Sequence, residues 1–384
     1  MQESLYNLAP VFHVMGVGAL FAGLPLAWFW RRQRAAGPRR RLQALTLLTL
    51  ALTFELVLVG AFTRLTDSGL GCPDWPGCYG SASPLGAAQH ISAAQAAMPT
   101  GPVTHSKAWI EMVHRYMATG VGVLIIVLTL WTWREWRQDR AQAVHPLWPA
   151  LTLVWVCLQG AFGALTVTMK LFPAIVTLHL LLAVGLLALL ALQAVRYEGW
   201  GQVMVGRGLR TAMGLASALL WLQIALGGWV STNYAVLACS DFPTCQGQWW
   251  PAMNWQGFAL WRELGHGADG QPLPFDALAS IHHVHRSMAW PVLAVLVTLG
   301  WRLRAVAGLE RQAQWLLGLC ALQLITGLSN VVLDWPLLAA VLHTGGASAL
   351  MVTLVWSLAR SRAALLTAAP ALWRATPDSS RPVA

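Results

Sequence analysis

Lys107-Ala-Trp-Ile-Glu-Met-Val-His-Arg-Tyr116 is the stretch around which the rest of this chain is organised. It places Glu111, His114 and Arg115 at the start of an apolar run, 117–133, that contains no charged residue. With its flanks, this run is long enough to cross a bilayer as a helix. Ionisable side chains so close to a membrane span are costly, so we regard them as candidates for function.

The same arrangement returns later in the chain as Ile281-His-His-Val-His-Arg286, which opens another apolar run. The His-Arg pair recurs there as His285 and Arg286, while His282 stands in the place of Glu111. The repetition suggests two related halves, and the one difference suggests that the halves do different work.

The composition indicates an all-α polytopic membrane protein. Of the 384 residues, 57% are hydrophobic and only 10% are charged, whereas soluble domains carry about a quarter charged residues. Soluble globular and disordered proteins are therefore excluded. The formal net charge of +10 would by itself suggest nucleic acid as a partner, but the positions of the basic residues give it another meaning.

Nine apolar stretches have the length of a membrane span. Their approximate ranges are 11–30, 43–63, 109–133, 147–168, 173–195, 209–231, 279–301, 312–333 and 336–359.

The arginines cluster after the first, third, fifth, seventh and ninth stretches. The positive-inside rule places these connections in the cytoplasm, so the N-terminus and the loops 64–108 and 232–278 are expected outside, with the C-terminus cytoplasmic. The excess of basic residues is then explained by the orientation of the chain in the membrane, and no nucleic-acid partner is expected. The first stretch ends in Trp28-Phe-Trp-Arg-Arg32, without a small-residue cleavage site, and is expected to be retained.

Three landmarks recur at nearly constant separations of 167, 171 and 164 positions. The pairs are Cys72 and Cys239, His114 and His285, and His179 and His343. Stretches two to five and six to nine are therefore expected to be two parallel copies of a four-helix unit.

This repeat divides the chain into four parts. They are an extra N-terminal helix with a basic loop (1–42), a first unit (43–200), a second unit (201–362) and a cytoplasmic tail (363–384).

The repeated histidines are candidate metal ligands. His114 and His179 each lie five or six residues inside spans that enter from outside, which is roughly 8–9 Å below the outer boundary. His285 and His343 occupy like positions in the second unit. A single membrane histidine is more often a hydrogen-bond partner between helices. Four histidines at one depth instead favour two pairs, each able to hold a planar metal macrocycle such as haem.

Arg115 and Arg286 follow the candidate ligands on the outer side, where a guanidinium group would suit the propionates of a haem. The plain alternative is that both side chains extend to the lipid headgroups.

Four cysteines lie in the outer loops as two pairs, Cys72 with Cys78 and Cys239 with Cys245. An oxidising exterior favours a disulfide within each pair, while zinc needs four ligands and usually closer spacing. Since so short a loop gains little stability from closure, a redox or loop-shaping role is as well supported as stapling.

Three motifs, at 71–80, 107–116 and 281–286, resemble the signatures of haem A synthases. The resemblance extends from about residue 43 to 360 and includes both cysteine pairs, both His-Arg pairs and both late histidines. This family oxidises a ring methyl of haem O to the formyl group of haem A. The additional N-terminal span departs from the usual eight-helix form.

The resemblance implies a role for each unit. His285 and His343 would bind a resident haem b, and His114 and His179 would bind the substrate haem O. Glu111 matches the family's essential acid, and the four loop cysteines match its outer cysteines. The implied partners are haem O, haem A and the lipid bilayer in a bacterial cytoplasmic membrane. Haem O synthase, oxidase assembly proteins and a second copy of the chain are further candidates, and the electron donor is not indicated.

Glu111 lies one helical turn before His114, on about the same face. A carboxylate there could take a proton or stabilise positive charge on an oxidised methyl carbon, and a salt bridge to Arg115 is the plainer alternative. Two other functions also fit bis-histidine sites: a transmembrane electron-transfer cytochrome b that leaves its haem unmodified, and a haem carrier. Glu111 and the cysteine loops favour the enzyme.

Overall fold

The computed structural model describes residues 9–140, 143–198 and 202–363. Nearly all of the predicted cytoplasmic tail lies outside these ranges. The described residues form ten α-helices, one 3₁₀ helix (η1, Trp255–Phe258) and two short strands. The α-helices are α1 (Ala9–Arg32), α2 (Pro38–Leu65), α3 (Ala88–Ala97), α4 (His105–Gln138), α5 (Leu147–Thr168), α6 (Pro173–Glu198), α7 (Arg207–Thr232), α8 (Phe275–Leu303), α9 (Glu310–Val332) and α10 (Leu337–Arg360).

The predicted all-α polytopic fold is confirmed. Each of the nine apolar stretches is a helix, and eight helices of the described chain are long and apolar enough to cross a membrane. The exception is α8, whose 29 residues include buried polar side chains, among them His282 and His283. These side chains lower its mean hydropathy although the helix is long enough to span.

Local sequence explains where several helices begin. Thr104 caps α4, because its hydroxyl accepts a hydrogen bond from the backbone N–H of Lys107 at 3.3 Å. Pro38 and Pro173 open α2 and α6, where a missing N–H and a fixed φ suit the first helical turn. The helix that carries Glu111 and His114 thus starts at a defined N-cap residue, Thr104.

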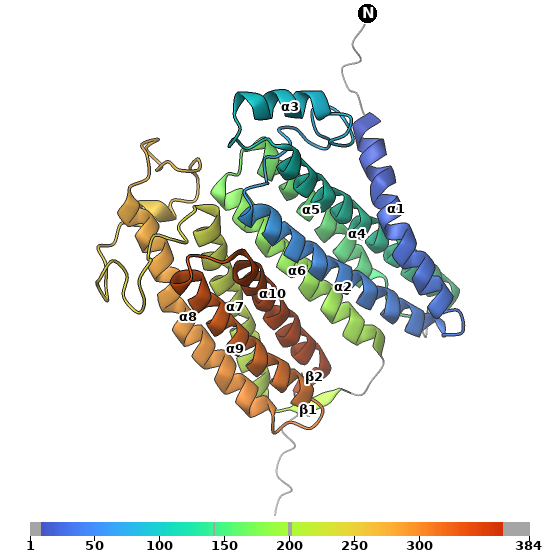
Figure 1. Ribbon diagram of the computed structural model, residues 1–384. Helices are drawn as coiled ribbons and strands as arrows, with labels where there is room; N and C mark the ends of the chain where they lie inside the picture. The colour runs from blue at the N-terminus through green and yellow to red at the C-terminus, as the bar shows by residue number, and fades with distance from the viewer. Residues whose placement is uncertain (1–8, 141–142, 199–201, 364–384) are drawn as a thin grey trace, which may run out of the picture.

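The long helices form two four-helix bundles side by side (Figure 1). In the first bundle α2, α4, α5 and α6 pack in a ring, and in the second α7, α8, α9 and α10 do the same. The bundles meet where α6 packs on α7 and α10, and where α2 packs on α10. Near the C-terminal ends of α2 and α7, Arg64 donates to the carbonyl of Ser231 over 2.5 Å.

The extra helix α1 packs against α4, on the outside of the first bundle (Figure 1). The two helices approach closely at Gly18, where an added Cβ would lie 2.4 Å from Thr119. Phe29 is 2% exposed and packs edge to face on Trp131. This contact fixes α1 to the helix that carries Glu111 and His114.

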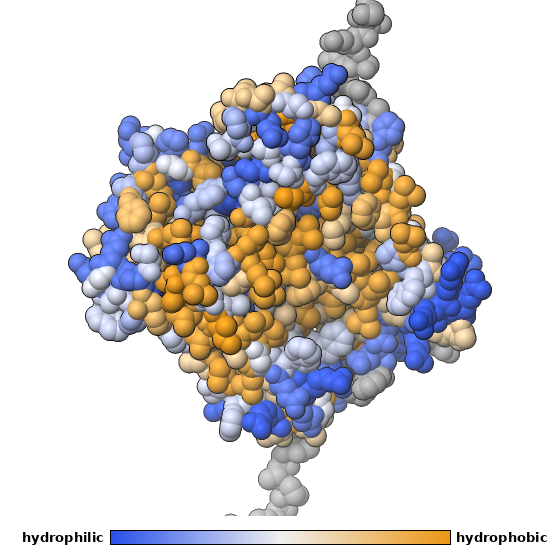
Figure 2. Space-filling model, viewed as in Figure 1, coloured by the Kyte–Doolittle hydropathy of each residue, from blue (hydrophilic) through white to orange (hydrophobic). Residues whose placement is uncertain are grey.

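Apolar side chains cover the middle of the molecule and polar ones its two ends, as Figure 2 shows for one face. At one end β1 (Val203–Val205) pairs in parallel with β2 (Ser361–Ala363), which joins the segment before α7 to the segment after α10. The long loops with α3 and η1 lie at the other end (Figure 1). This separation of polar ends from an apolar middle is what a bilayer requires.

Candidate functional site

All four repeated histidines line one cavity of about 1010 Å³ that reaches into both bundles. His114 comes from α4 and His179 from α6, while His285 and His343 come from α8 and α10. The cavity lining is mostly apolar, with a few polar side chains near these rings. The structure therefore places all four candidate ligands at one cavity, and their binding of a metal stays a prediction.

His285 and His343 face each other at a separation that suits a metal between them. Their ring centres lie 6.5 Å apart and their planes meet at 84°. Two metal–imidazole bonds of about 2 Å, with about 1 Å from each nitrogen to its ring centre, would separate two axial rings by about 6 Å. The pair thus fits the axial ligands of one haem.

Each histidine ring lies against a glycine of a neighbouring helix, so that an added Cβ would come within 2.9–3.2 Å of the ring. The pairs are Gly60 with His114, Gly163 with His179, Gly227 with His285, and Gly327 with His343. Contacts this short are rare for a real Cβ, so each glycine makes room for an imidazole. We did not predict this role from the sequence, although the glycines recur at matching positions in the two copies.

Thr326 defines the protonation of His343. Its hydroxyl donates to the carbonyl of Leu322 over 2.7 Å and lies 2.9 Å from Nδ1 of His343. Because the hydroxyl proton is already used, the hydroxyl oxygen accepts from Nδ1–H, and the lone pair of Nε2 is left for a metal.

The other rings are held differently. The Gln223 amide nitrogen lies 3.1 Å from Nδ1 of His285. That of Gln159 lies 3.4 Å from Nε2 of His179, whose buried Nδ1 has no partner. Among the described residues, the His114 ring makes no hydrogen bond. The four rings therefore differ in their hydrogen bonds: three have a side-chain partner within the described residues and His114 has none.

Glu111 is 4% exposed and both of its carboxylate oxygens are engaged. One accepts a hydrogen bond from the backbone N–H of Cys72 over 2.8 Å, and the other pairs with the guanidinium of Arg115. In the second copy the N–H of Cys239 lies 3.3 Å from Nδ1 of His282. Glu111 and His282 thus occupy one structural position, with an anion in the first copy and a neutral hydrogen-bond acceptor in the second.

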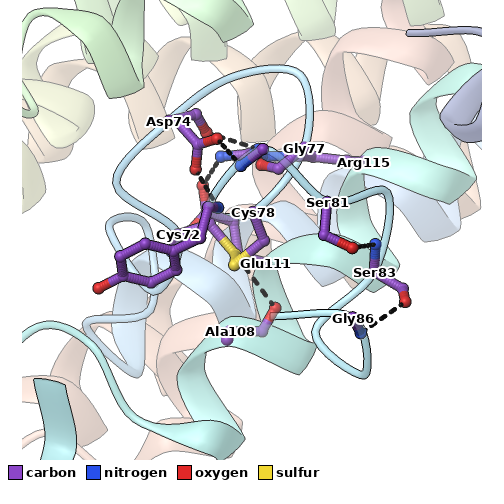
Figure 3. The surroundings of a disulfide bond; sticks show 12 residues. Cys72, Asp74, Gly77, Cys78, Ser81, Ser83, Gly86, Ala108, Glu111 and Arg115 are labelled. Atoms are coloured by element: carbon purple, nitrogen blue, oxygen red, sulfur yellow. Dashed lines mark hydrogen bonds and ion pairs between the residues drawn. A yellow bond between two sulfur atoms is a disulfide. The ribbon is translucent and has the colours of Figure 1, made fainter. Parts of the chain in front are cut away.

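Both arginines that follow the candidate ligands bind the disulfide loops. Arg115 donates to the carbonyls of Asp74, Pro76 and Gly77, over 2.9, 3.2 and 2.5 Å (Figure 3). Arg286 makes the equivalent contacts to Asp241, Pro243 and Thr244, over 3.0, 3.2 and 3.1 Å. Both guanidinium groups are thus bonded to backbone carbonyls of these loops, and binding of propionates by these arginines stays a prediction.

The four outer cysteines form two disulfides, Cys72–Cys78 and Cys239–Cys245 (Figure 3 shows the first). Because the thiols are used in these bonds, the structure does not contain the zinc site that the spacing left open. Through Cys72 and Arg115, the first disulfide loop is bonded directly to Glu111.

An aspartate closes each disulfide loop. Asp74 accepts from the backbone N–H groups of Tyr79 and Gly80, over 2.6 and 2.7 Å. Asp241 does the same for Gln246 and Gly247, over 2.7 and 2.9 Å. The Thr244 hydroxyl and these N–H groups lower the pKa of Asp241 to about 2. The two loops are thus built alike.

Comparison with known proteins gives consistent matches. The sequence profile of a family described as "Cytochrome oxidase assembly protein" matches residues 43–355. A "Heme A synthase" of Shewanella oneidensis is 38% identical over 312 residues, covering 80% of this chain and 93% of that protein. Proteins of the same name from Methylobacterium sp. (30% identical, 83% and 92% covered) and Halalkalibacterium halodurans (28%, 80% and 94%) are also similar. Helix α1 lies outside the family match.

Proposed function

The chain belongs to this family of cytochrome oxidase assembly proteins, which includes the haem A synthases, and on that premise we propose that it oxidises a ring methyl of haem O to the formyl group of haem A for a terminal oxidase. The relatives' shared name and coverage support the reaction. The observation that carries it is the cavity lined by two histidine pairs, with one buried acid at its edge.

We propose a division of labour between the bundles. His285 and His343, whose ring centres lie 6.5 Å apart, would hold a resident haem b that passes electrons. His114 and His179 would hold haem O as substrate. The support is the asymmetry at one equivalent position, since Glu111 can take a proton from a reacting methyl group and the neutral His282 offers no anion there.

The protein's own residues would contribute three effects. When bound, the haem supplies the methyl group and the redox chemistry of its iron. The histidines orient the macrocycle, and the apolar cavity wall excludes water from it. Pairing with Arg115 favours the ionised form of Glu111 and opposes the cost of burying its charge, and the carboxylate at the cavity edge would accept a proton or stabilise developing positive charge.

We also propose a bacterial cytoplasmic membrane with the N-terminus outside and the C-terminus in the cytoplasm. Arg31 and Arg32 end α1, and Arg360 ends α10, as the positive-inside rule requires for this orientation. The disulfide loops then face the oxidising side. Haem O synthase and oxidase assembly proteins are the proposed macromolecular partners.

The test is to express the chain in cells that make haem O but no haem A, and to identify the extracted porphyrins by mass. The wild-type chain should yield haem A, and His114→Ala should not. His13→Ala, at an exposed residue of α1, is the matched control and should yield haem A. Recovery of only haem b and unmodified haem O with the wild-type chain would instead indicate the electron-transfer cytochrome or a carrier.

A further inference from the structure

Each glycine that accommodates a histidine ring is followed, four residues later, by a second residue that lines the cavity. These residues are Arg64 in α2, Val167 in α5, Ser231 in α7 and Val331 in α9. Residues four apart share one face of a helix, so each of the four lies one turn beyond a ring-facing glycine, toward the C-terminal end of its helix. Of the four, only Arg64 carries a charge.

Arg64 also differs from the other two arginines that line the cavity within the described residues, Arg115 and Arg286. Arg115 pairs with Glu111 and donates to three loop carbonyls, and Arg286 donates to three others. The guanidinium of Arg64 makes a single hydrogen bond in the described chain, from Nη2 to the carbonyl of Ser231. Its Nε–H and Nη1–H groups are therefore available to a further acceptor.

The side chain of Arg64 is held at the junction of the two bundles. It extends from α2 in the first bundle to the Ser231 carbonyl near the end of α7 in the second. It also stacks on the ring of Tyr234, with 4.1 Å from Cζ to the ring centre. The Tyr234 hydroxyl donates to Asp67, whose carboxylate pairs with Lys107 at 3.5 Å, so within the described chain Arg64 has no acidic partner. The guanidinium is thus oriented in advance, which lowers the entropy cost of binding an anion.

We propose that Arg64 binds a carboxylate of the haem in the first bundle, that is, a propionate of the macrocycle held by His114 and His179. This inference rests on the proposed function. Arg64 shares a helix face with Gly60, which makes room for the His114 ring, so its free N–H groups belong to the same haem site. An unpaired carboxylate is costly to bury in a mostly apolar cavity, and a guanidinium is the group best suited to pair with it. In the second bundle Ser231 offers no charge at this position.

Esterification of the haem tests this assignment, because it removes the negative charge of both propionates and leaves the iron and the ring unchanged. The purified full-length chain is titrated with b-type haem and, separately, with its dimethyl ester. A His343→Ala background, expected to lack the resident haem, isolates the signal of the first bundle. The chain that retains Arg64 should bind the acid more tightly by about tenfold or more, as expected for a hydrogen bond between charged groups. Arg64→Gln should remove this preference.

Lys170→Gln is the matched control, because it removes one positive charge from an exposed residue just after α5 that does not line the cavity. It should keep the preference for the acid. Arg64→Lys restores a charge without the planar fork of a guanidinium, and should recover part of the preference lost in Arg64→Gln. Arg64→Met, uncharged and of similar length, replaces Arg64→Gln if that variant does not fold, which the low-spin spectrum of the resident haem reports in a His343-containing protein.

Two results would overturn the proposal: equal binding of acid and ester by the chain that retains Arg64, or an undiminished preference for the acid in a folded Arg64→Gln or Arg64→Met protein. The first result needs no substitution at Arg64, and the second would return the propionates to Arg115. Since binding is measured without turnover, its outcome is independent of the proposed reaction. A chain whose preference depended on Arg64 but that left haem O unmodified would refute the enzyme and retain the carboxylate site.

Discussion

The backbone N–H of Cys72 donates to the carboxylate of Glu111 over 2.8 Å, which joins the first disulfide loop to the acid beside His114. Arg115 strengthens this connection because it binds both that carboxylate and the carbonyls of the loop. The second bundle has the equivalent hydrogen bond between disulfide loop and helix, with His282 in place of the acid. Glu111 therefore has an anchoring task that its counterpart shares, and a charge that its counterpart lacks.

Glu111→Gln should separate these two tasks. The amide oxygen can still accept from Cys72, but the proton acceptor and the anion are lost. We expect conversion of haem O to fall by on the order of 10²–10⁴, with haem content close to wild type. Haem O, or a partly oxidised methyl such as the alcohol, should accumulate. Porphyrin extraction, normalised to protein in the membrane, measures this, and Glu111→Asp should be less impaired.

The matched control for Glu111 is His282→Gln, which alters the equivalent hydrogen bond to Cys239 in the second bundle. It should leave most haem A production intact if the charge of Glu111 is what matters. Equal losses from the two variants would show that loop anchoring explains both, and a normal haem A yield from Glu111→Gln would remove its catalytic role.

Histidine substitutions should distinguish the bundles. His285→Ala or His343→Ala should abolish the low-spin spectrum of the proposed resident haem, because each would remove one of its two proposed axial ligands. His114→Ala or His179→Ala should leave that spectrum largely intact while stopping conversion. Optical spectra of the purified variants report the first effect, and porphyrin analysis reports the second. A uniform loss of resident haem across all four variants is incompatible with the assignment of one haem to each bundle.

Gly227→Ala should displace the His285 ring, since the new Cβ would lie 2.9 Å from Cε1 of the imidazole. We expect loss of most resident haem, seen as a lower ratio of haem absorbance to protein absorbance. Gly214→Ala in the same helix is the control, because nothing lies within 4 Å of a Cβ there. That change should retain haem and stabilise α7 by about 0.5–1 kcal/mol. Equal haem content in the two variants would contradict the proposed role of Gly227.

Thiol labelling should reveal both disulfides. Cys72, Cys78, Cys239 and Cys245 should resist a membrane-impermeant maleimide on intact spheroplasts until a reductant is added. Mass spectrometry of the labelled peptides gives the extent at each site. Free reaction before reduction would mean that these loops carry thiols in the cell.

The second loop should have an acid-sensitive element at Asp241. Its folded pKa, about 2, lies below the ordinary value of 3.8. Its contribution to stability is therefore complete above pH 3.8 and is lost as the pH falls through about 2. Asp241→Asn should lower loop stability at neutral pH, and the difference from wild type should vanish near pH 2. Protease susceptibility of the loop in detergent, measured across this range, tests the sign.

The helices and their division into two bundles could be predicted from the sequence, because hydropathy and internal repeats are both properties of the residue order alone. Apolar runs located the long helices, and constant offsets placed His179 and His343 as partners of the two His-Arg pairs. Helix α8 was predicted as the apolar stretch 279–301 and again by the repeat, although its mean hydropathy is lowered by the polar side chains that it buries.

The contacts within the site were harder to foresee because they depend on how each helix is rotated about its axis. The facing of Gly227 and His285, and the bond from Thr326 to His343, involve residues far apart in sequence. The path of the disulfide loops brought their carbonyls to Arg115, which sequence reasoning had directed toward propionates. The glycines that recur at matching positions in the two copies were the one available signal.

The two bundles also have a consequence for how such a protein can specialise. Oligomers of identical chains place the same residue at every equivalent position. A tandem chain is free of that constraint, because each copy of the four-helix unit carries its own residues. Glu111 opposite His282 is one such difference. A symmetric pair of identical four-helix subunits would carry the acid in both copies or in neither, and could not give its two histidine pairs different surroundings.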